Sequence, residues 1–500
     1  MKLTSDLLST SEGNINVDMA KKTFKIVFLQ TVTVPYMGIM SISAVLKKYG
    51  FLTNVFSIDY EKQSVVQNIL KAGPDLLACS VMTPDVEETM KVINAVKEKK
   101  QDAFTVMGGP HTTFLPEILN TEKNLDAVCI GEGEHAMLEL ASSLKGGRVN
   151  NRIKNLHFKQ NGEIIRNEAR SLIEDLDSLP FPDRDLYFEK YHFLFNEMID
   201  YSNSRGCPFN CSYCHNKGMR NLYKGKGSWL RFRKNENVIE EIKATINKYP
   251  AKYVRFLDDT LNVKPKRFKE FLLMYKKEVN VPFVCNLRID LANEEQIEQL
   301  KNAGVSRISI GIEHGDEDFR KKVLYRDYKN QQILDFSKWV NKRGIRIHTF
   351  NIMGFPGETL DMAFSTVEIN AKIKPTMAYA HILNPYPGTD ILEYAKSVGS
   401  LNELNLNALS AHQPLYLSGS KVKSVIKDKD IPEIINLRCF FMILVWYPWM
   451  KPLVKVLIKI PNNRFYEFLW LATGSFRLSW KFAGWMERRT LLKKLFKRLV

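Results

Sequence analysis

The stretch SNSRGCPFNCSYC, residues 202–214, carries three cysteines within eight residues: Cys207, Cys211 and Cys214. A [4Fe-4S] cluster is normally held by four thiolates, so three thiolates would leave one iron open to an outside ligand. The spacing C-x3-C-x2-C wraps one cluster on a single short loop. Zinc is the alternative, because His215 follows directly and would supply the fourth ligand that zinc requires. The motif predicts a metal centre, with a cluster favoured over zinc.

The chain around this loop alternates apolar runs with helical patterns. Strand-like runs lie at residues 199–204, 253–258, 283–287, 307–312, 346–353 and 378–383. Six βα units in about 200 residues predict a partial (β/α)6 barrel of the TIM type, with its chemistry in the loops at the carboxyl ends of the strands. We expect this barrel to cover residues 199–400.

Residues 24–148 show the same alternation in a separate block. Short apolar runs lie at residues 24–29, 54–58, 75–82, 104–107 and 126–130. They predict an α/β domain with a Rossmann-like, doubly wound parallel sheet, whose ligand lies at the carboxyl ends of the strands. Glycines in the loops at those ends would let a ligand approach the backbone closely. The polar residues and glycines singled out in these loops are Thr83, Gly108, Gly109, His111, Gly131 and Glu132.

Three segments fall outside these two domains. Residues 1–23 form an N-terminal extension without an apolar run of signal-peptide length, so we expect no secretion signal. Residues 149–198 are expected to be a linker, with a hairpin around Asn161-Gly162. Residues 401–500 are expected to form a helical region rich in basic and aromatic side chains.

The composition excludes several classes of protein. Of the 500 residues, 45% are hydrophobic and 25% are charged, which excludes a disordered chain and leaves room for several globular domains. Seven cysteines are too few for a secreted disulfide scaffold, and we expect the four outside the loop to be buried apolar residues: Cys79, Cys129, Cys285 and Cys439. We therefore expect a reducing, cytoplasmic location.

The net charge of +17 is concentrated at the C-terminal end, where 13 Lys and Arg stand against 3 Asp and Glu from Glu433 to Val500. The apolar run CFFMILVWYPWM, residues 439–450, is too short to span a bilayer, which takes about 20 residues. Basic and aromatic residues interleave after it. The pattern fits helices that bind anionic lipid at a membrane surface, or helices that pack their aromatic side chains on the barrel. Of these two alternatives, we slightly favour peripheral membrane contact over packing on the barrel. We expect no nucleic-acid partner.

Residues 24–400 resemble the cobalamin-dependent radical S-adenosylmethionine (SAM) enzymes. The cysteine loop has their C-x3-C-x2-C spacing, and Tyr213 occupies the aromatic position before the last cysteine. Segments similar to the family's later barrel strands are RFLDDT (255–260), NLRID (286–290), ISIGIEHG (308–315), NIMGFPGET (351–359) and NPYPGT (384–389). Segments similar to its first domain are GGPHTTFLP (108–116), IGEGE (130–134) and LPFPDR (179–184).

This resemblance implies a set of cofactor contacts. Cys207, Cys211 and Cys214 would bind a [4Fe-4S] cluster, with SAM on the open iron. The residues implied for SAM are Asp258, Asp259, Arg288 and Glu313, and those implied for cobalamin are Thr83, Gly108, Gly109, His111, Gly131 and Glu132. The alternative role for Asp259 or Thr260 is to cap the next helix. The D-x-H-x-x-G signature for cobalt ligation is absent, so we expect His111 to have a hydrogen-bonding role.

The function implied by the resemblance is a radical SAM enzyme that cleaves SAM to a 5′-deoxyadenosyl radical. We expect a C-methyltransferase, in which cobalamin between the two domains delivers a methyl group to an unactivated carbon. Two alternatives stay open: a cyclisation, rearrangement or oxidation with the same cofactors, and a zinc-stabilised protein that binds lipid or nucleic acid. The implied partners are a small-molecule or lipid-like substrate and an electron donor such as flavodoxin or ferredoxin. No residue is assigned to the substrate.

Overall fold

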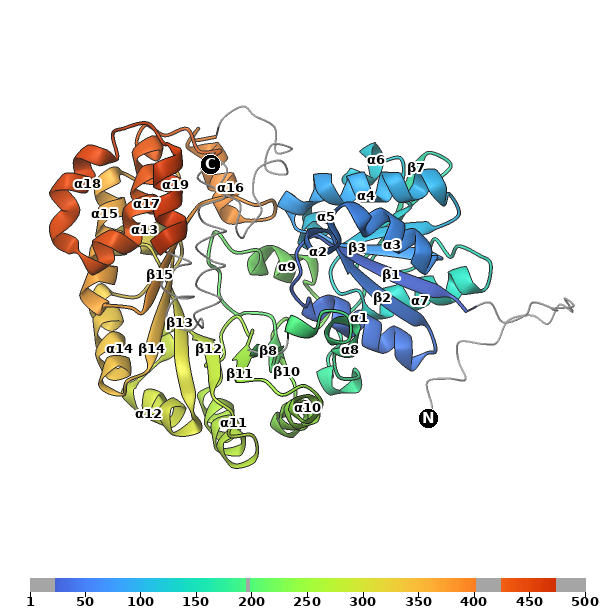
Figure 1. Cartoon of the computed structure of the whole chain (residues 1–500), viewed down its shortest axis with the longest axis horizontal. Helices are drawn as coiled ribbons and strands as arrows, with labels where there is room; N and C mark the ends of the chain where they lie inside the picture. The colour runs from blue at the N-terminus through green and yellow to red at the C-terminus, as the bar shows by residue number, and fades with distance from the viewer. Residues whose placement is uncertain (1–22, 195–197, 402–423, 474–500) are drawn as a thin grey trace, which may run out of the picture.

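The computed structural model describes residues 23–194, 198–401 and 424–473. Figure 1 shows two α/β domains side by side, with the last helices packed against the barrel on the side away from the first domain. Residues 1–22 of the N-terminal extension, and residues 402–423 and 474–500 of the C-terminal region for which lipid contact is expected, lie outside the described residues.

The first domain is built on a seven-stranded sheet of order β2-β1-β3-β4-β5-β6-β7. Its strands are β1 (Lys25–Gln30), β2 (Leu52–Ser57), β3 (Leu76–Ser80), β4 (Phe104–Gly108), β5 (Ala127–Cys129), β6 (Leu156–Gln160) and β7 (Glu163–Arg166). Its helices are α1 (Met37–Lys48), α2 (Ile58–Glu61), α3 (Val65–Ala72), α4 (Val86–Lys99), α5 (Pro110–Phe114), α6 (Ile118–Thr121) and α7 (Glu134–Lys145). The first five strands pair in parallel, which confirms the predicted doubly wound fold.

Successive side chains of β1 show why helices cover both faces of this sheet. Ile26 and Phe28 belong to the core that contains residues of α1 and α7, whereas Val27 and Leu29 belong to the core that contains residues of α3 and α4. Because side chains alternate between the faces of a strand, a fully apolar strand needs a packed layer on each side. The continuous apolar run in the sequence therefore produces the three-layer domain.

The expected linker contributes two strands to this sheet. β6 and β7 form a hairpin with Asn161 and Gly162 at its turn, both with positive φ, as a tight two-residue hairpin turn requires. β6 pairs antiparallel with β5, so the sheet continues beyond residue 148. Residues 149–198 thus extend the first domain as well as leading to the second.

The second domain is an open parallel barrel of order β15-β14-β13-β12-β11-β8. Its strands are β8 (Met198–Tyr201), β11 (Tyr253–Phe256), β12 (Phe283–Leu287), β13 (Val305–Glu313), β14 (Arg346–Met353) and β15 (Met377–Ile382), and a small ribbon, β9 (Ser204–Arg205) with β10 (Arg231–Phe232), lies beside them. Its helices are α9 (Asn216–Leu222), α10 (Asn235–Lys248), α11 (Pro265–Glu278), α12 (Glu294–Ala303), α13 (Glu317–Lys322), α14 (Asn330–Lys342), α15 (Leu360–Ile373) and α16 (Asp390–Ser397). The short helix α8 (Asp185–Phe188) precedes the barrel and contacts β2 of the first domain. All six strands match predicted runs, and β8 and β15 are the edges that leave the barrel partial.

In the described part of the C-terminal region, three helices are added to the barrel: α17 (Ile431–Trp446), α18 (Lys451–Leu457) and α19 (Arg464–Leu471). The apolar run from residue 439 lies largely in α17, where Phe440, Phe441 and Leu444 are buried in one core with residues of α15 and β15. This stretch therefore packs on the barrel, as the second alternative predicts. Across the described ranges, no helix combines the length and apolarity needed to cross a membrane.

Candidate functional site

A cavity of about 410 Å³ opens among the loops at the carboxyl ends of the barrel strands. Cys207, Cys211 and Cys214, from the loop between β9 and α9, all line it. Asn216 Nδ2 donates to Cys214 Sγ at 3.4 Å, and Arg288 Nη1 donates to Cys211 Sγ at 3.6 Å. Donors at two sulfurs suit thiolates that carry negative charge. This donor set fits the predicted cluster.

Burial affects the thiols in this cavity. It raises the pKa of the Cys207 thiol, and it raises the pKa of the Cys214 thiol to about 11. A bound metal overrides this effect, because a coordinating thiol is deprotonated outright. The loop is therefore suited to hold thiolates when a metal centre is present.

The alternative zinc site lacks its fourth ligand. His215 is exposed at the start of α9 and is not among the residues that line the cavity. Among the described residues, no three His, Cys, Asp or Glu side chains converge as one metal ion requires. A single zinc holds every sulfur at about 2.3 Å, whereas a cluster binds each thiolate at a different iron, so its sulfurs stand further apart. The position of His215 therefore counts against a four-ligand zinc site.

Three of the four residues implied for SAM line the same cavity: Asp259, Arg288 and Glu313. Arg288 is buried, and its guanidinium lies 3.6 Å from the centre of the Phe209 ring. Arg288 also donates to both carboxylate oxygens of Asp290, at 2.9 and 2.8 Å. Stacking and this ion pair fix the guanidinium at the cysteine loop, where its Nη1 faces Cys211.

Asp258, the fourth, does not line the cavity. Its buried carboxylate accepts hydrogen bonds from the Asn203 backbone N–H, at 3.1 and 3.0 Å, and from the Ser204 hydroxyl. It therefore fixes the chain that leads into the cysteine loop. The capping alternative for Asp259 and Thr260 is wrong, because α11 begins only at Pro265, after Lys264.

We expect Asp258→Asn to change how stability depends on pH. Burial raises the pKa of Asp258 from 3.8 to about 6, so the folded protein holds this proton more tightly than the unfolded chain. The stabilisation is complete below pH 3.8 and is lost as the pH rises through about 6, a change of about 3 kcal/mol. Calorimetric unfolding across this window should show the wild type losing stability relative to the variant. Parallel curves for the two proteins would contradict the assignment.

Glu313 ends β13 in a strained conformation that brings it over the cavity. Its φ is +65°, and the register between β13 and β14 shifts between Gly311 and Glu313. Arg326 Nη1 donates to Glu313 Oε1 at 3.2 Å and to the Tyr213 hydroxyl at 2.8 Å. Any side chain at Gly311 would overlap the Glu313 carboxylate. Burial raises the pKa of Glu313. A strained backbone conformation such as this positive φ persists only where the surrounding contacts hold it in place.

Two residues of the site, Arg326 and Asn216, are not identified by any of the sequence motifs. Arg326 is buried in the segment after α13, where no motif surrounds it, and Asn216 directly follows His215. Asn216 bonds both Cys214 and Asp259, the latter at 3.1 Å. The only sequence signal for Asn216 is its closeness to the last cysteine.

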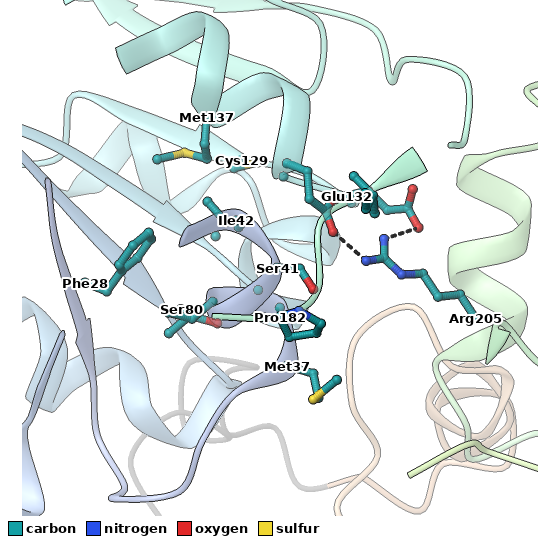
Figure 2. Close-up of a pocket in the computed structure, with 18 of the residues that line it drawn as sticks. Phe28, Met37, Ser41, Ile42, Ser80, Cys129, Glu132, Met137, Pro182 and Arg205 are labelled. Carbon is teal, nitrogen blue, oxygen red and sulfur yellow. Dashed lines mark hydrogen bonds and ion pairs between the residues drawn. The ribbon is translucent and has the colours of Figure 1, made fainter. Parts of the chain in front are cut away.

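A second cavity, of about 470 Å³, lies between the two domains (Figure 2). The first domain contributes residues at the carboxyl ends of β3, β4 and β5, and the barrel side contributes residues near β8, β9 and β11. Gly108, Gly109, Gly131 and Glu132 line it, as predicted for a ligand site, but Thr83 and His111 do not. The apolar part of its wall is formed by Phe28, Ile39, Ile42, Ala78, Val106 and Met137.

His111 is buried beside this cavity. Its Nδ1 lies 3.2 Å from Thr83 Oγ1, and burial lowers the pKa of His111 to about 4. The imidazole is therefore neutral at physiological pH. This contact agrees with the expected hydrogen-bonding role.

An ion-pair cluster joins the two domains at the edge of the second cavity. Figure 2 shows Arg205 of the barrel side reaching Glu132 of the first domain. Arg205 Nη2 also lies 2.6 Å from Glu134, and Arg231 Nη2 lies 2.7 Å from Glu132. Burial opposes ionisation of Glu132, but hydrogen bonds from Arg231 and the charge of Arg205 lower its pKa overall. Glu132 thus acts as a fixed anion between the domains.

Gly131 permits a close approach of the two domains. Its φ is +67°, and a side chain there would overlap the hydroxyl of Tyr223, which follows α9. The same hydroxyl accepts a hydrogen bond from the Glu132 backbone N–H at 2.7 Å. Leu257, directly after β11, lines both cavities. The two cavities are therefore neighbours across one side chain.

Two family models match the chain. The Radical SAM superfamily model matches residues 201–368, and the B12 binding domain model matches residues 31–141. The first match contains the cysteine cavity's loop and most of the barrel strands, and the second contains the glycine loops of the interdomain cavity.

Curated relatives include two kinds of enzyme. The chain is 31% identical over 360 residues to the uncharacterized methyltransferase PH0819 of Pyrococcus horikoshii, covering 71% of this chain and 77% of the relative. It is 26% identical over 362 residues to the anaerobic magnesium-protoporphyrin IX monomethyl ester cyclase of Rubrivivax gelatinosus, covering 70% of this chain and 64% of the relative.

Solved structures share the whole architecture. The radical SAM methyltransferase TsrM from Kitasatospora setae, with cobalamin and a [4Fe-4S] cluster bound, superposes with a TM-score of 0.66 at 16% identity, covering 95% of this chain and 99% of its own. The cobalamin-dependent SAM radical enzyme OxsB superposes with a TM-score of 0.66 at 16% identity, covering 92% of this chain and 72% of its own. At this identity the likeness establishes the fold alone.

Proposed function

The chain belongs to the cobalamin-dependent radical SAM family, and from this premise we propose that it is a C-methyltransferase that holds SAM, a [4Fe-4S] cluster and cobalamin. One observation carries the proposal: a cavity lined by three cysteines and a cavity lined by the glycine loops of the B12-binding domain meet at Leu257. A radical enzyme that transfers a methyl group needs its two cofactors this close to one substrate.

The chain's own residues bind and orient these groups. Cys207, Cys211 and Cys214 hold the cluster, and Arg288, Asp259 and Glu313 receive SAM in the same cavity. Gly108, Gly109 and Gly131 let cobalamin approach the backbone. When bound, the cofactors supply radical cleavage of SAM and methyl delivery to an unactivated carbon.

The side chains around the cavities shape the site for this chemistry. The carboxylate of Asp259 suits the amino group of SAM. The guanidinium of Arg288, which is oriented by its ion pair with Asp290, suits the carboxylate of SAM. Glu313 is positioned by Arg326 to accept hydrogen bonds from ribose hydroxyls. The apolar wall of the interdomain cavity excludes water from the reacting carbon. The reductant is a small one-electron carrier such as flavodoxin or ferredoxin.

A second candidate, radical cyclisation, is favoured by the relatives named as cyclases. The two candidates differ in the products formed from SAM. Methyl transfer would use the sulfonium methyl group of SAM and release S-adenosylhomocysteine, whereas reductive cleavage alone would release methionine and 5′-deoxyadenosine. We expect anaerobically reconstituted protein with SAM, cobalamin and a chemical reductant to form both adenosyl products. Formation of 5′-deoxyadenosine without S-adenosylhomocysteine would favour cyclisation.

We expect His111→Asn to leave the coordination of cobalt in bound cob(II)alamin unchanged. His111 bonds Thr83 and does not line the cavity, so it is not available as an axial ligand. Electron paramagnetic resonance reports axial nitrogen through hyperfine splitting. A splitting present in the wild type and lost in His111→Asn would show that His111 ligates cobalt.

A further inference from the structure

Charged side chains form one layer across the barrel below the proposed cofactor site. The strand register places Asp200 of β8 beside Arg255 of β11, and Arg307 of β13 beside Arg346 of β14, with Val284 of β12 between the two pairs. Arg255 and Arg307 line the cysteine cavity. The layer therefore forms the floor of that cavity.

The floor holds three arginines and one aspartate. Arg255 donates to both oxygens of Asp200, at 2.6 Å each, so this carboxylate is already matched. Arg346 donates through Nε to the Ser306 carbonyl oxygen at 3.2 Å. Within the described ranges, Arg307 pairs with no carboxylate, and its buried Nε has no hydrogen-bond partner. Arg307 is half-buried, and a guanidinium nitrogen that is buried without an acceptor is costly, which points to an acceptor brought by a ligand.

The neighbours of Arg307 offer no carboxylate. The groups that interact with it electrostatically are Tyr379, Arg255, Arg346 and Cys285, and none of them is a carboxylate. His348, two residues after Arg346 on β14, has a pKa lowered to about 3 by burial and by Arg307 and Arg346. It is therefore neutral and offers no negative charge.

The floor lies below the residues implied for SAM. Arg307 precedes Gly311 by four residues on β13, about 13 Å at the rise of a parallel strand. Gly311 and Glu313 stand at the level of the cysteine loop, where Arg288 already suits the SAM carboxylate. Arg307 is thus left for a second ligand in the same cavity.

We propose that Arg307 binds an anionic group, a carboxylate or a phosphate, of the substrate of the proposed enzyme. The rest of that substrate extends from the floor toward the cysteine loop. Phe350, which is 38% exposed, pairs with Gly311 at the level of the cysteine loop, lines the cavity there and stacks on Tyr379 with ring centres 5.4 Å apart. An anionic end and an apolar or aromatic body are the features that this surface recognises. The inference rests on the proposed function for its substrate, but Arg307 can be tested without turnover.

The test is calorimetric titration of the full-length protein, with and without reconstituted cluster and SAM. The probes are phenyl phosphate, phenylacetate and uncharged benzyl alcohol. We expect at least one anion to bind in the millimolar range and benzyl alcohol not to bind. Arg307→Met should weaken anion binding roughly tenfold or more, and Arg307→Lys should weaken it less. Preference between the two anions distinguishes a phosphate from a carboxylate.

Saturating SAM occupies Arg288, the other arginine that could bind the anionic probes. The matched control variant is Arg148→Met, because Arg148 is an exposed arginine of the first domain. Circular dichroism of each variant checks that it is folded, and Arg307→Lys replaces Arg307→Met if the latter is not. Equal anion binding in the wild type and the folded Arg307 variant, or no anion binding in the wild type, overturns the proposal. If SAM fails to bind while anion binding depends on Arg307, the proposed function fails and the anion site stands.

Discussion

Cys211→Ala is expected to reduce bound iron and sulfide, and with them SAM cleavage, to background. Cys211 lines the cysteine cavity beside Cys207 and Cys214, and Arg288 already places a donor at its sulfur. A cluster held by only two thiolates of the protein exposes a second iron and is lost. We therefore expect complete loss of the cluster rather than a partial decrease in bound iron.

The matched control is Cys285→Ala. Cys285 lies on β12, is buried, and lines the same cavity, but it stands outside the three-cysteine motif. Each variant removes one cysteine thiol from the same cavity, so the two substitutions are equal in size. Iron analysis, the absorption of the cluster and assay of 5′-deoxyadenosine should separate them. Full iron content in Cys211→Ala, or iron loss in Cys285→Ala, would show that the ligand assignment is wrong.

Ser80→Trp is expected to abolish cobalamin binding while leaving the cluster in place. Ser80 ends β3 and faces the interdomain cavity, as Figure 2 shows. A tryptophan there would fill space between Met37 and Cys129 that the cofactor would occupy. The cysteine cavity lies on the other side of Leu257, so its iron should be retained.

Ser142→Trp is the control for this substitution, because Ser142 is exposed on α7 and lines neither cavity. Cobalamin retained after gel filtration, read by absorption, should match the wild type in Ser142→Trp and fall to background in Ser80→Trp. Retention of cobalamin by a folded Ser80→Trp would place the cofactor elsewhere.

Sequence periodicity predicts the architecture because it reflects burial directly. Each parallel strand is covered on both faces, so it appears as an unbroken apolar run, and β1 shows the rule with Val27 and Phe28 facing opposite cores. The hairpin of β6 and β7 was predicted, but its pairing with β5 was not. Pairing between distant strands depends on the tertiary fold, and a local pattern does not encode it.

The site is predictable where its residues share a local motif. The three cysteines and the glycine loops are of this kind, and they line the two cavities. Asp258 and Asp259 are adjacent in sequence, yet one side chain fixes the chain before the cysteine loop and the other faces the cavity. Arg326 and Arg307 reach the cavity only because distant segments meet there. Side-chain direction and long-range packing decide these roles.

The measurement that tests the central claim most directly is the iron, sulfide and cobalt content of full-length protein reconstituted without oxygen in the presence of hydroxocobalamin. Two neighbouring cavities with the residues described here predict about four irons and one cobalt per chain. Four irons without cobalt would contradict the role of the interdomain cavity. Zinc without iron would contradict the whole mechanism.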